Sequence, residues 1–522
     1  MIMRAALTKG VTMTTSAPYI LAIDQGTSST RAVIYDHDGR KVIESMKPVP
    51  HINNHSGWVE QDPDVIWSSV LSAIAAALID AQIHPEMIHS IGITNQRETT
   101  VVWDRNTGKP IYPAIGWLSQ QTNHLADQLR QDGKAGVIRE KTGLVIDAYF
   151  SATKLRWILD QVPGAQTRAE AGDLLFGTID TWLMWKLSAG RIHATDYTNA
   201  SRTMLFNIHT LEWDADILRM LNIPRTMLPK VQPSDAVYGF TENYQFYGVQ
   251  VPIAGLAGDQ QAALVGSMSF TPGMVEGTYG DGAFIMMNTG TQPAKHADRL
   301  LTTIAYGMNG TVSYGLEGTI FTAGRALLWL RDELGLIKDV PASRKAANEA
   351  DPQSNVYLVP AFTGLGAPYW DTKTRGAIFG MTQATGANEL VQATLQSIAY
   401  RTKDIVDEME TATQLAITQF GADGGSSRNT YLMEFLADIL AKPVQRTSDE
   451  ETTAWGAAVL SGLATGFWKD VDEVQQITTT GRCFTAKMTE PVRQRRLRGW
   501  RRAVQAAQSF QPQANHDQKE HE

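Results

Sequence analysis

The feature that most constrains the fold is a short motif that occurs twice. Residues 19–23 form an apolar run that predicts a strand, followed by a turn of glycine and hydroxyl residues at 24–30 and a second strand at 31–35. Residues 273–287 repeat this order of strand, Gly/Thr turn and strand. Two such hairpins, far apart in one chain, predict two α/β domains of related design.

Between and after the hairpins the pattern becomes helical. Asp62 followed by Pro63 is a typical helix start. Residues 90–94 predict a strand that ends in Asn-Gln-Arg-Glu, and helices are expected near 324–334 and 388–410. We expect a disordered extension at 1–18, an N-terminal domain at 19–268, a C-terminal domain at 269–507 and a disordered tail at 508–522.

Composition excludes several classes of protein. The 522 residues include 46 Lys+Arg and 54 Asp+Glu, a net charge of −8 that gives no basic footprint for nucleic acid. No uninterrupted apolar stretch approaches the roughly 18 to 20 residues of a membrane span, and residues 1–18 lack the apolar core of a signal peptide. The single cysteine, Cys483, cannot form an internal disulfide. We expect a cytoplasmic multidomain enzyme without membrane insertion.

Common catalytic motifs are missing. The chain has no G-x-x-x-x-G-K-[ST] loop, no G-x-G-x-x-G, no H-E-x-x-H and no C-x-x-C. Ser151 to Lys154 matches the S-x-x-K of serine acylases, but the K-T-G at 141–143 precedes it and no S-D-N follows. We therefore interpret Lys154 as part of a packed helix. Six arginines between 493 and 502 predict the solvated face of a terminal helix.

The turn at 24–31 has the chemistry of a phosphate site. Small residues allow close approach of the backbone, and successive N–H groups with nearby hydroxyls can bind phosphate oxygens. Arg31 adds charged donors, and Asp24 offers a carboxylate for hydrated Mg²⁺. A plain polar turn is the alternative. The second loop at 277–282 and the glycines after Asp423 favour two phosphate loops and an adenosine-binding turn across a cleft.

Longer matches identify a family. The chain resembles the FGGY family of carbohydrate kinases from about residue 19 to about residue 504. Residues 24–31 resemble the family's first phosphate loop, and its two signatures match at 149–158 and at 376–381 continuing through 393–396. Further long matches, in the expected order, lie at 92–100, 196–201, 257–261 and 362–370.

This resemblance implies a fold of two duplicated actin-like ATPase (ribonuclease H-like) domains with a central cleft. It also implies transfer of the γ-phosphoryl group of ATP to glycerol, with Mg²⁺ as cofactor and a homo-oligomer, dimer or tetramer, as assembly. Asp259 is implied as the general base, and the alternative is that it only orients the hydroxyl or binds Mg²⁺ through water. The implied metal site is Asp24 with Asp259.

The resemblance carries over residue by residue. The positions that match the polyol site are Arg97, Glu98, Tyr149, Asp259 and Gln260, with Trp117 and Phe284 as apolar walls and Thr27 beside them. The positions that match the nucleotide site are Thr27, Ser28, Ser29, Arg31, Asp281, Gly324, Leu328, Gly425 and Asn429.

Three nucleotide-site residues depart from the family pattern. Asp281 replaces a usual Thr, Arg325 replaces a small residue, and Leu328 replaces a Gln. A carboxylate about 4 Å from a phosphate charge costs about 4 kcal/mol at an effective dielectric constant of about 20. Arg325 could compensate this charge, or Asp281 could ligate Mg²⁺. Two other functions therefore stay open: a kinase for another small polyol, and a nucleotide-binding sensor or pseudokinase.

Overall fold

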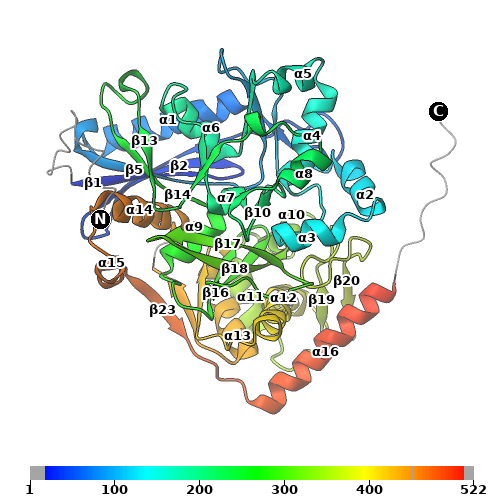
Figure 1. The fold of residues 1–522 in the computed structure, drawn as a ribbon. Helices are drawn as coiled ribbons and strands as arrows, with labels where there is room; N and C mark the ends of the chain where they lie inside the picture. The colour runs from blue at the N-terminus through cyan, green and yellow to red at the C-terminus, as the bar shows by residue number, and fades with distance from the viewer. Residues whose placement is uncertain (1–17, 296, 449–450, 511–522) are drawn as a thin grey trace.

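The computed structural model describes residues 18–295, 297–448 and 451–510. Its first sheet has the order β13 (Val237–Phe240), β14 (Pro252–Gly258), β5 (Ile88–Asn95), β1 (Tyr19–Gln25), β2 (Ser29–Asp36) and β3 (Lys41–Pro48). Strand β1 is antiparallel to β2 and parallel to β5. The first predicted hairpin is therefore present at the centre of this sheet, as Figure 1 shows.

The second sheet repeats this arrangement. Its order is β17 (Leu301–Met308), β18 (Thr311–Ile320), β16 (Ala283–Gly290), β15 (Met274–Tyr279), β21 (Gln419–Asp423), β22 (Val444–Thr447) and β23 (Thr480–Phe484). Strand β15 is antiparallel to β16 and parallel to β21, as β1 is to β2 and β5. Two α/β units with one topology confirm the predicted duplication.

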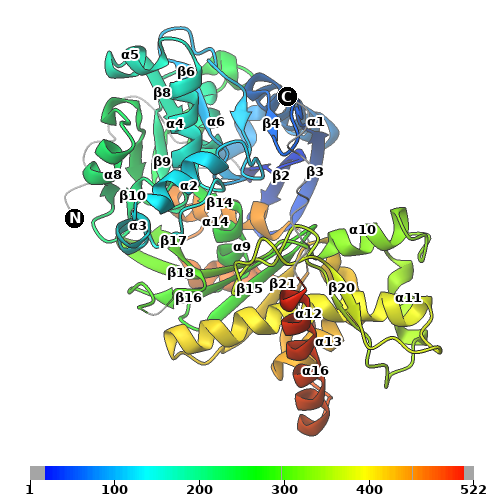
Figure 2. The same ribbon diagram turned by 90° about the vertical axis from the view of Figure 1, so that its right-hand side faces the viewer.

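The remaining elements cover these sheets and fill the region between them (Figures 1 and 2). The helices are α1 (Pro63–Asp80), α2 (Asn123–Gln131), α3 (Ala135–Thr142), α4 (Ser151–Gln161), α5 (Ala165–Glu170), α6 (Ile179–Leu187), α7 (Tyr197–Ala200), α8 (Ala215–Met220), α9 (Asp259–Gly266), α10 (Gly324–Asp332), α11 (Ala342–Glu349), α12 (Ala387–Thr413), α13 (Thr430–Leu440), α14 (Thr452–Thr465), α15 (Val471–Ile477) and α16 (Glu490–Ser509). The short strands are β4 (Glu60–Gln61), β6 (Val101–Asp104), β7 (Ala114–Ile115), β8 (Leu174–Gly177), β9 (Ala194–Asp196), β10 (Phe206–Asn207), β11 (Glu212–Trp213), β12 (Lys230–Gln232), β19 (Tyr357–Val359) and β20 (Ala377–Phe379).

Helix α1 begins as the sequence predicts. The Asp62 side chain caps it by accepting a hydrogen bond from the backbone N–H of Asp64, and Pro63 is its first residue. Among the described residues, α1 is the one helix long and apolar enough to cross a membrane. Half of it is buried, and its apolar face packs on the first sheet, so its hydrophobicity is that of a core helix.

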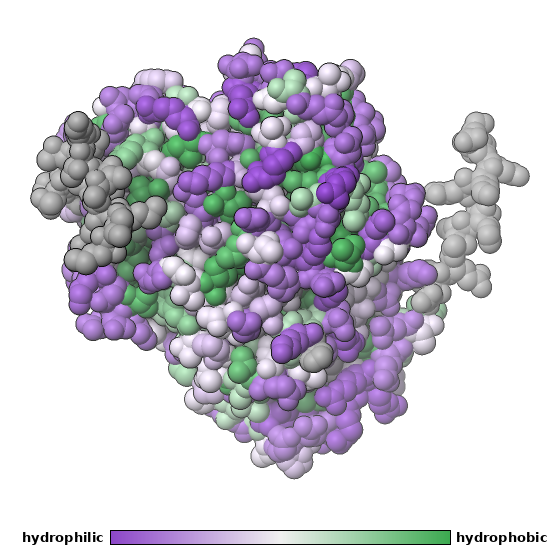
Figure 3. All heavy atoms as spheres, viewed as in Figure 1, coloured by the Kyte–Doolittle hydropathy of each residue, from purple (hydrophilic) through white to green (hydrophobic). Residues whose placement is uncertain are grey.

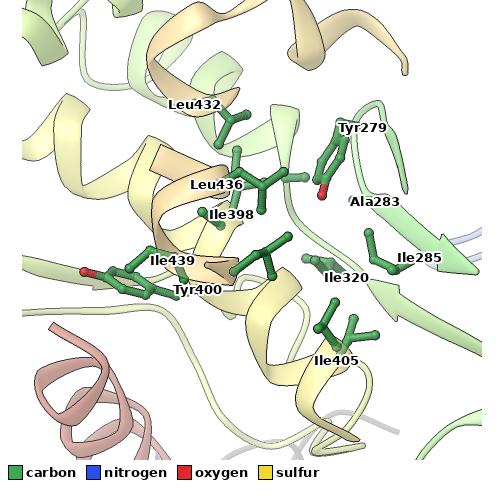
Figure 4. Close-up of a cluster of buried hydrophobic side chains, with 14 of the residues drawn as sticks. Tyr279, Ala283, Ile285, Ile320, Ile398, Tyr400, Ile405, Leu432, Leu436 and Ile439 are labelled. Carbon is green, nitrogen blue, oxygen red and sulfur yellow. The ribbon is translucent and has the colours of Figure 1, made fainter. Parts of the chain in front are cut away.

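The second domain has its own core, in which α12 and α13 pack against the sheet (Figure 4). Tyr279 and Ile285 from the second hairpin belong to the same buried cluster as Ile398 and Leu436 from these helices. Helix α16 ends at Ser509, so it extends two residues into the segment expected to be a disordered tail. Residues 1–17 and 511–522 of the predicted disordered ends lie outside the described residues.

The six arginines of α16 were expected on a solvated helix face, and this is only partly correct. Arg495, Arg498, Arg501 and Arg502 are exposed, and hydrophilic residues dominate the lower right edge of Figure 3, where α16 runs. Arg493 is instead buried, and its Nε donates to the carbonyl oxygen of Asp438. One arginine of the six therefore anchors the helix to α13.

Two helices cross at the centre and join the domains. Helix α9 follows β14 of the first sheet, whereas α14 comes late in the chain and packs on β1, β5 and β14. The helices touch through glycines: a Cβ on Gly456 would lie 1.9 Å from the carbonyl oxygen of Ala262, and one on Gly266 would lie 2.1 Å from that of Thr452. The two backbones are therefore as close as glycine permits.

This crossing gives a testable prediction about stability. We expect Gly456→Ala to lower the free energy of unfolding by about 1–3 kcal/mol, because the added methyl group must push two helix backbones apart. Gly136→Ala is the matched control, since Gly136 lies in α3 and a Cβ there would meet nothing within 4 Å. Urea denaturation of both variants measures the effect. Equal stability of Gly456→Ala and Gly136→Ala would contradict the close crossing.

Candidate functional site

The turn of the first hairpin presents small side chains beside a tryptophan. The backbone N–H of Gly26 donates to the Ser29 carbonyl oxygen at 2.9 Å, which closes the turn. Ser28 is exposed, and the Thr27 hydroxyl accepts a hydrogen bond from Trp117 Nε1 at 2.9 Å. Thr27 thus links the candidate phosphate turn to the candidate polyol wall.

Asp24 and Arg31 face each other across the same hairpin. Asp24 Oδ2 accepts a hydrogen bond from the Thr453 hydroxyl at 2.8 Å and lies 3.8 Å from Arg31 Nη1. Arg31 Nε also lies 3.5 Å from Glu44 and 3.4 Å from Glu451. Burial raises the pKa of Asp24, and Arg31 partly opposes this rise. The Arg31 charge is therefore shared among three carboxylates.

The candidate polyol residues gather where β5 and β14 end. Arg97 and Glu98 follow β5 and are almost fully buried, and Asp259 is the first residue of α9. Arg97 Nε lies 3.1 Å from Asp259 Oδ1, which also accepts the backbone N–H of Gln260 at 2.7 Å. Adjacent parallel strands thus bring together a guanidinium donor and two carboxylate acceptors.

Aromatic side chains stand next to this charged group. The Trp117 ring centroid lies 5.6 Å from that of Tyr149 and 6.0 Å from that of Phe284. The Arg97 guanidinium carbon lies 5.6 Å from the Phe284 ring centre. Phe284 belongs to β16, so the second domain contributes one apolar wall beside Arg97, Glu98 and Asp259 of the first domain.

The Asp259 carboxyl has an unusual acidity. Burial raises its pKa to about 7, Arg97 opposes the rise, and the charges of Glu98 and Asp24 add to it. Its side chain keeps 29% of its surface exposed, so a small molecule can reach it. A carboxylate with a pKa near neutrality is a stronger base than an ordinary aspartate and suits proton abstraction from an alcohol.

The candidate nucleotide loops converge on the start of α10. The backbone N–H groups of Gly324 and Arg325 donate to the carbonyl oxygens of Gly280 and Asp281 at 2.9 and 3.0 Å. A Cβ on Gly324 would lie 2.6 Å from the Gly280 carbonyl oxygen and 2.9 Å from Ser426 Oγ. The second hairpin, α10 and the turn after Gly425 therefore meet at one glycine, and a Cβ on Gly425 itself would face open space.

The side chains of the other candidate nucleotide residues differ in exposure and in the hydrogen bonds that they already make. Asp281 and Arg325 form an ion pair at 3.8 Å, and each side chain is 70% exposed. Leu328 lies one turn further along α10 and is half-buried. The Asn429 side chain caps α13 and donates to Ser343 Oγ at 3.0 Å, so its amide is already engaged within the protein.

Sequence reasoning missed two fully buried charged residues in this site. Arg202 Nε donates to Glu98 Oε1 at 2.7 Å, and Arg202 Nη2 donates to Glu317 Oε1 at 2.9 Å. Glu317 Oε2 also accepts from Arg97. Two patterns in the sequence could have indicated these residues. Glu317 is a lone glutamate within the apolar strand 314–320, and Arg202 directly follows the stretch 196–201 that matches the family.

The S-x-x-K sequence has a supporting role. The Ser151 hydroxyl donates to the Glu98 carbonyl oxygen at 3.0 Å, and Lys154 Nζ donates to the carbonyl oxygens of Glu98 and Tyr149. Burial lowers the pKa of Lys154 to about 7. Both side chains are committed to the backbone of two candidate polyol residues, which agrees with a packed helix rather than an acyl-transfer site.

Comparison with known proteins reveals relatives along nearly the whole chain. Residues 19–266 match the N-terminal domain of the FGGY family of carbohydrate kinases, and residues 275–465 match its C-terminal domain. A glycerol kinase of Lactobacillus acidophilus is 56% identical over 492 residues, 94% of this chain and 98% of its own length. One from Streptococcus pyogenes is 55% identical over 499 residues, 96% of this chain and 98% of its own.

A solved structure is similar as well. The crystal structure of Plasmodium falciparum glycerol kinase with ADP superposes with a TM-score of 0.88 at 33% identity, covering 94% of this chain and 98% of that one. The overall fold and the order of the two domains are therefore shared with a nucleotide-binding kinase.

Proposed function

We propose that the chain, which belongs to the FGGY family of carbohydrate kinases, transfers the γ-phosphoryl group of ATP to a primary hydroxyl of glycerol. One observation carries this proposal. The Asp259 carboxylate lies beside Arg97, next to Glu98 and the rings of Trp117 and Phe284, and burial raises its pKa to about 7. Relatives at 55–56% identity named glycerol kinase support the choice of polyol.

The polyol is held by complementary hydrogen-bonding groups. Arg97 donates and Glu98 accepts, so together they fix neighbouring hydroxyls of a three-carbon polyol. The aromatic rings of Trp117 and Phe284 cover its carbon frame. Tyr149 stands beside Trp117, and Gln260 follows Asp259 in α9, so both complete the proposed polyol site. With two hydroxyls fixed, the third is directed at Asp259.

Asp259 then prepares the nucleophile. Its carboxylate accepts the proton of the primary hydroxyl as that oxygen attacks the γ-phosphorus, and the bond from phosphorus to the β-bridging oxygen breaks to release ADP. In phosphoryl transfer most of the catalysis comes from positioning and charge stabilisation, so a late proton transfer suffices. Enclosure between the two domains keeps water from competing with the polyol.

The two hairpin turns are the proposed phosphate sites. Thr27 and Ser28 lie in the first turn, Ser29 and Arg31 lie in β2 directly after it, Asp281 lies in the second turn, and Gly324 begins α10. We assign Leu328, Gly425 and Asn429 to the adenosine. Among the described residues, no three His, Cys, Asp or Glu side chains form a metal cage. Mg²⁺ bound with ATP needs only one or two carboxylates. Asp24 and Asp259, whose charges interact, fit that requirement and would hold the ion, which supplies charge neutralisation.

An assay of ADP release with different polyols tests the proposed reaction. We expect ADP release from Mg·ATP in the presence of glycerol, and we expect Asp259→Asn to lower kcat by at least about 100-fold, since general-base catalysis contributes about 10²–10⁴. A panel of other small polyols tests the neighbouring specificity. If another polyol and not glycerol supports ADP release, the substrate is that polyol. If the folded protein releases no ADP with any polyol, the result favours a nucleotide-binding sensor.

The acidity of Asp259 gives a pH prediction. The base works only when ionised, so kcat/KM for glycerol should fall about tenfold per pH unit as the pH drops below about 7. Steady-state rates from pH 5 to 9 with saturating Mg·ATP measure this limb. A flat profile down to pH 5 would show that Asp259 has an ordinary pKa or is not the base.

Asp281 and Arg325 give a prediction about ATP. Because their ion pair is local and exposed, water screens the repulsion between Asp281 and phosphates well below the 4 kcal/mol expected for an enclosed pair. We expect Arg325→Ala to raise the KM for ATP about threefold and the Asp281→Thr, Arg325→Ala double variant to restore it. If the double variant matches Arg325→Ala instead, Arg325 acts on ATP directly and not by compensating Asp281.

We also propose a cytoplasmic location, where ATP is available, and a homo-oligomer, dimer or tetramer, as the working assembly. Both follow from the family membership. Light scattering of the purified protein measures the assembly.

A further inference from the structure

A closed ring of four charged side chains lies behind the candidate polyol site. Arg97 Nη1 donates a hydrogen bond to Glu317 Oε2, and Arg202 Nη2 donates to Glu317 Oε1 at 2.9 Å. Arg202 Nε donates to Glu98 Oε1 at 2.7 Å, and the same Glu98 oxygen lies 3.9 Å from Arg97 Nε, which closes the ring. All four side chains are at most 2% exposed. Two positive and two negative charges make the ring neutral, which is how buried charges are tolerated.

The ring joins the two domains. Arg97 and Glu98 follow β5 of the first sheet, and Arg202 follows α7. Glu317 lies on β18, where its Cα partners are Met286 of β16 and Leu301 of β17 in the second sheet. One carboxylate of the second domain therefore holds two guanidinium groups of the first.

The ring also fixes the guanidinium that lies next to Asp259. Arg97 Nη1 donates to Glu317 Oε2 and to Gln261 Oε1, and Arg97 Nε lies 3.1 Å from Asp259 Oδ1. The charged groups that face Asp259 are Arg97, Glu98 and Asp24. Glu317 therefore fixes the guanidinium that lies beside the candidate base.

We propose that Glu317 and Arg202 are positioning residues for phosphoryl transfer: Glu317 fixes Arg97, and Arg202 fixes Glu98, so that both side chains are held for the polyol. This inference rests on the proposed function for its substrate. Neither residue touches the polyol in this account. Arg202 is itself packed over the Tyr149 ring, with its guanidinium carbon 5.6 Å from the ring centre.

The test removes the charge of Glu317 and follows glycerol. In Glu317→Gln, Arg97 and Arg202 lose the carboxylate that they share, so Arg97 and Glu98 are no longer held for the polyol. We expect the KM for glycerol to rise at least about fivefold while the KM for ATP stays within about twofold. Glu317→Asp keeps the charge but withdraws it, so its KM for glycerol should also rise.

Matched measurements separate the outcomes. Glu276→Gln removes another buried glutamate of the second sheet, on β15, and its KM for glycerol should stay unchanged. Calorimetric titration with glycerol in the absence of ATP reports the polyol affinity without turnover, so the inference and the proposed function fail separately. An unchanged glycerol affinity in folded Glu317→Gln would overturn the proposal. If that variant does not fold, an unchanged KM in Glu317→Asp would overturn it.

Discussion

The Arg97 guanidinium is shared between carboxylates from both domains, and the arrangement of the candidate site depends on this sharing. An unpaired charge at this depth would be strongly unfavourable. Glu317 supplies the counter-charge from the second sheet, while Asp259 and Glu98 come from the first. The buried charges are therefore balanced only when β18 lies against the ends of β5 and β14. The same set of ion pairs therefore holds the two domains together and fixes Arg97 beside Asp259.

The fold brings these groups together by repeating one topology. In both sheets a central hairpin lies beside two parallel strands, so the hairpin turn and the ends of the parallel strands lie at the same edge. Helix α14 packs on the first sheet and α9 contacts strands of both sheets, so their crossing through Gly456 and Gly266 joins the two sheets (Figure 1). Asp259 begins α9 and Thr453 lies in the first turn of α14. The same crossing therefore aligns the base and the hydrogen-bond partner of Asp24.

Local sequence was enough to predict the frame of this architecture. The two hairpins, the capped start of α1 and the helices α10 and α12 depend on short-range patterns, and the structure confirms them. Family membership was likewise predicted and is confirmed. The roles of Asp259, Arg97 and the nucleotide residues were inferred from the resemblance and stay predictions. The ring through Glu317 and Arg202 was not predicted, because three of its four pairs join residues more than a hundred positions apart.

A crystal structure with glycerol and a non-hydrolysable ATP analogue tests the central claim most directly. The account predicts a primary hydroxyl of glycerol within hydrogen-bond distance of the Asp259 carboxylate, the neighbouring hydroxyls on Arg97 and Glu98, and Glu317 still bonded to Arg97. Glycerol bound away from Asp259, or an Arg97 that leaves Glu317 when glycerol binds, would contradict it.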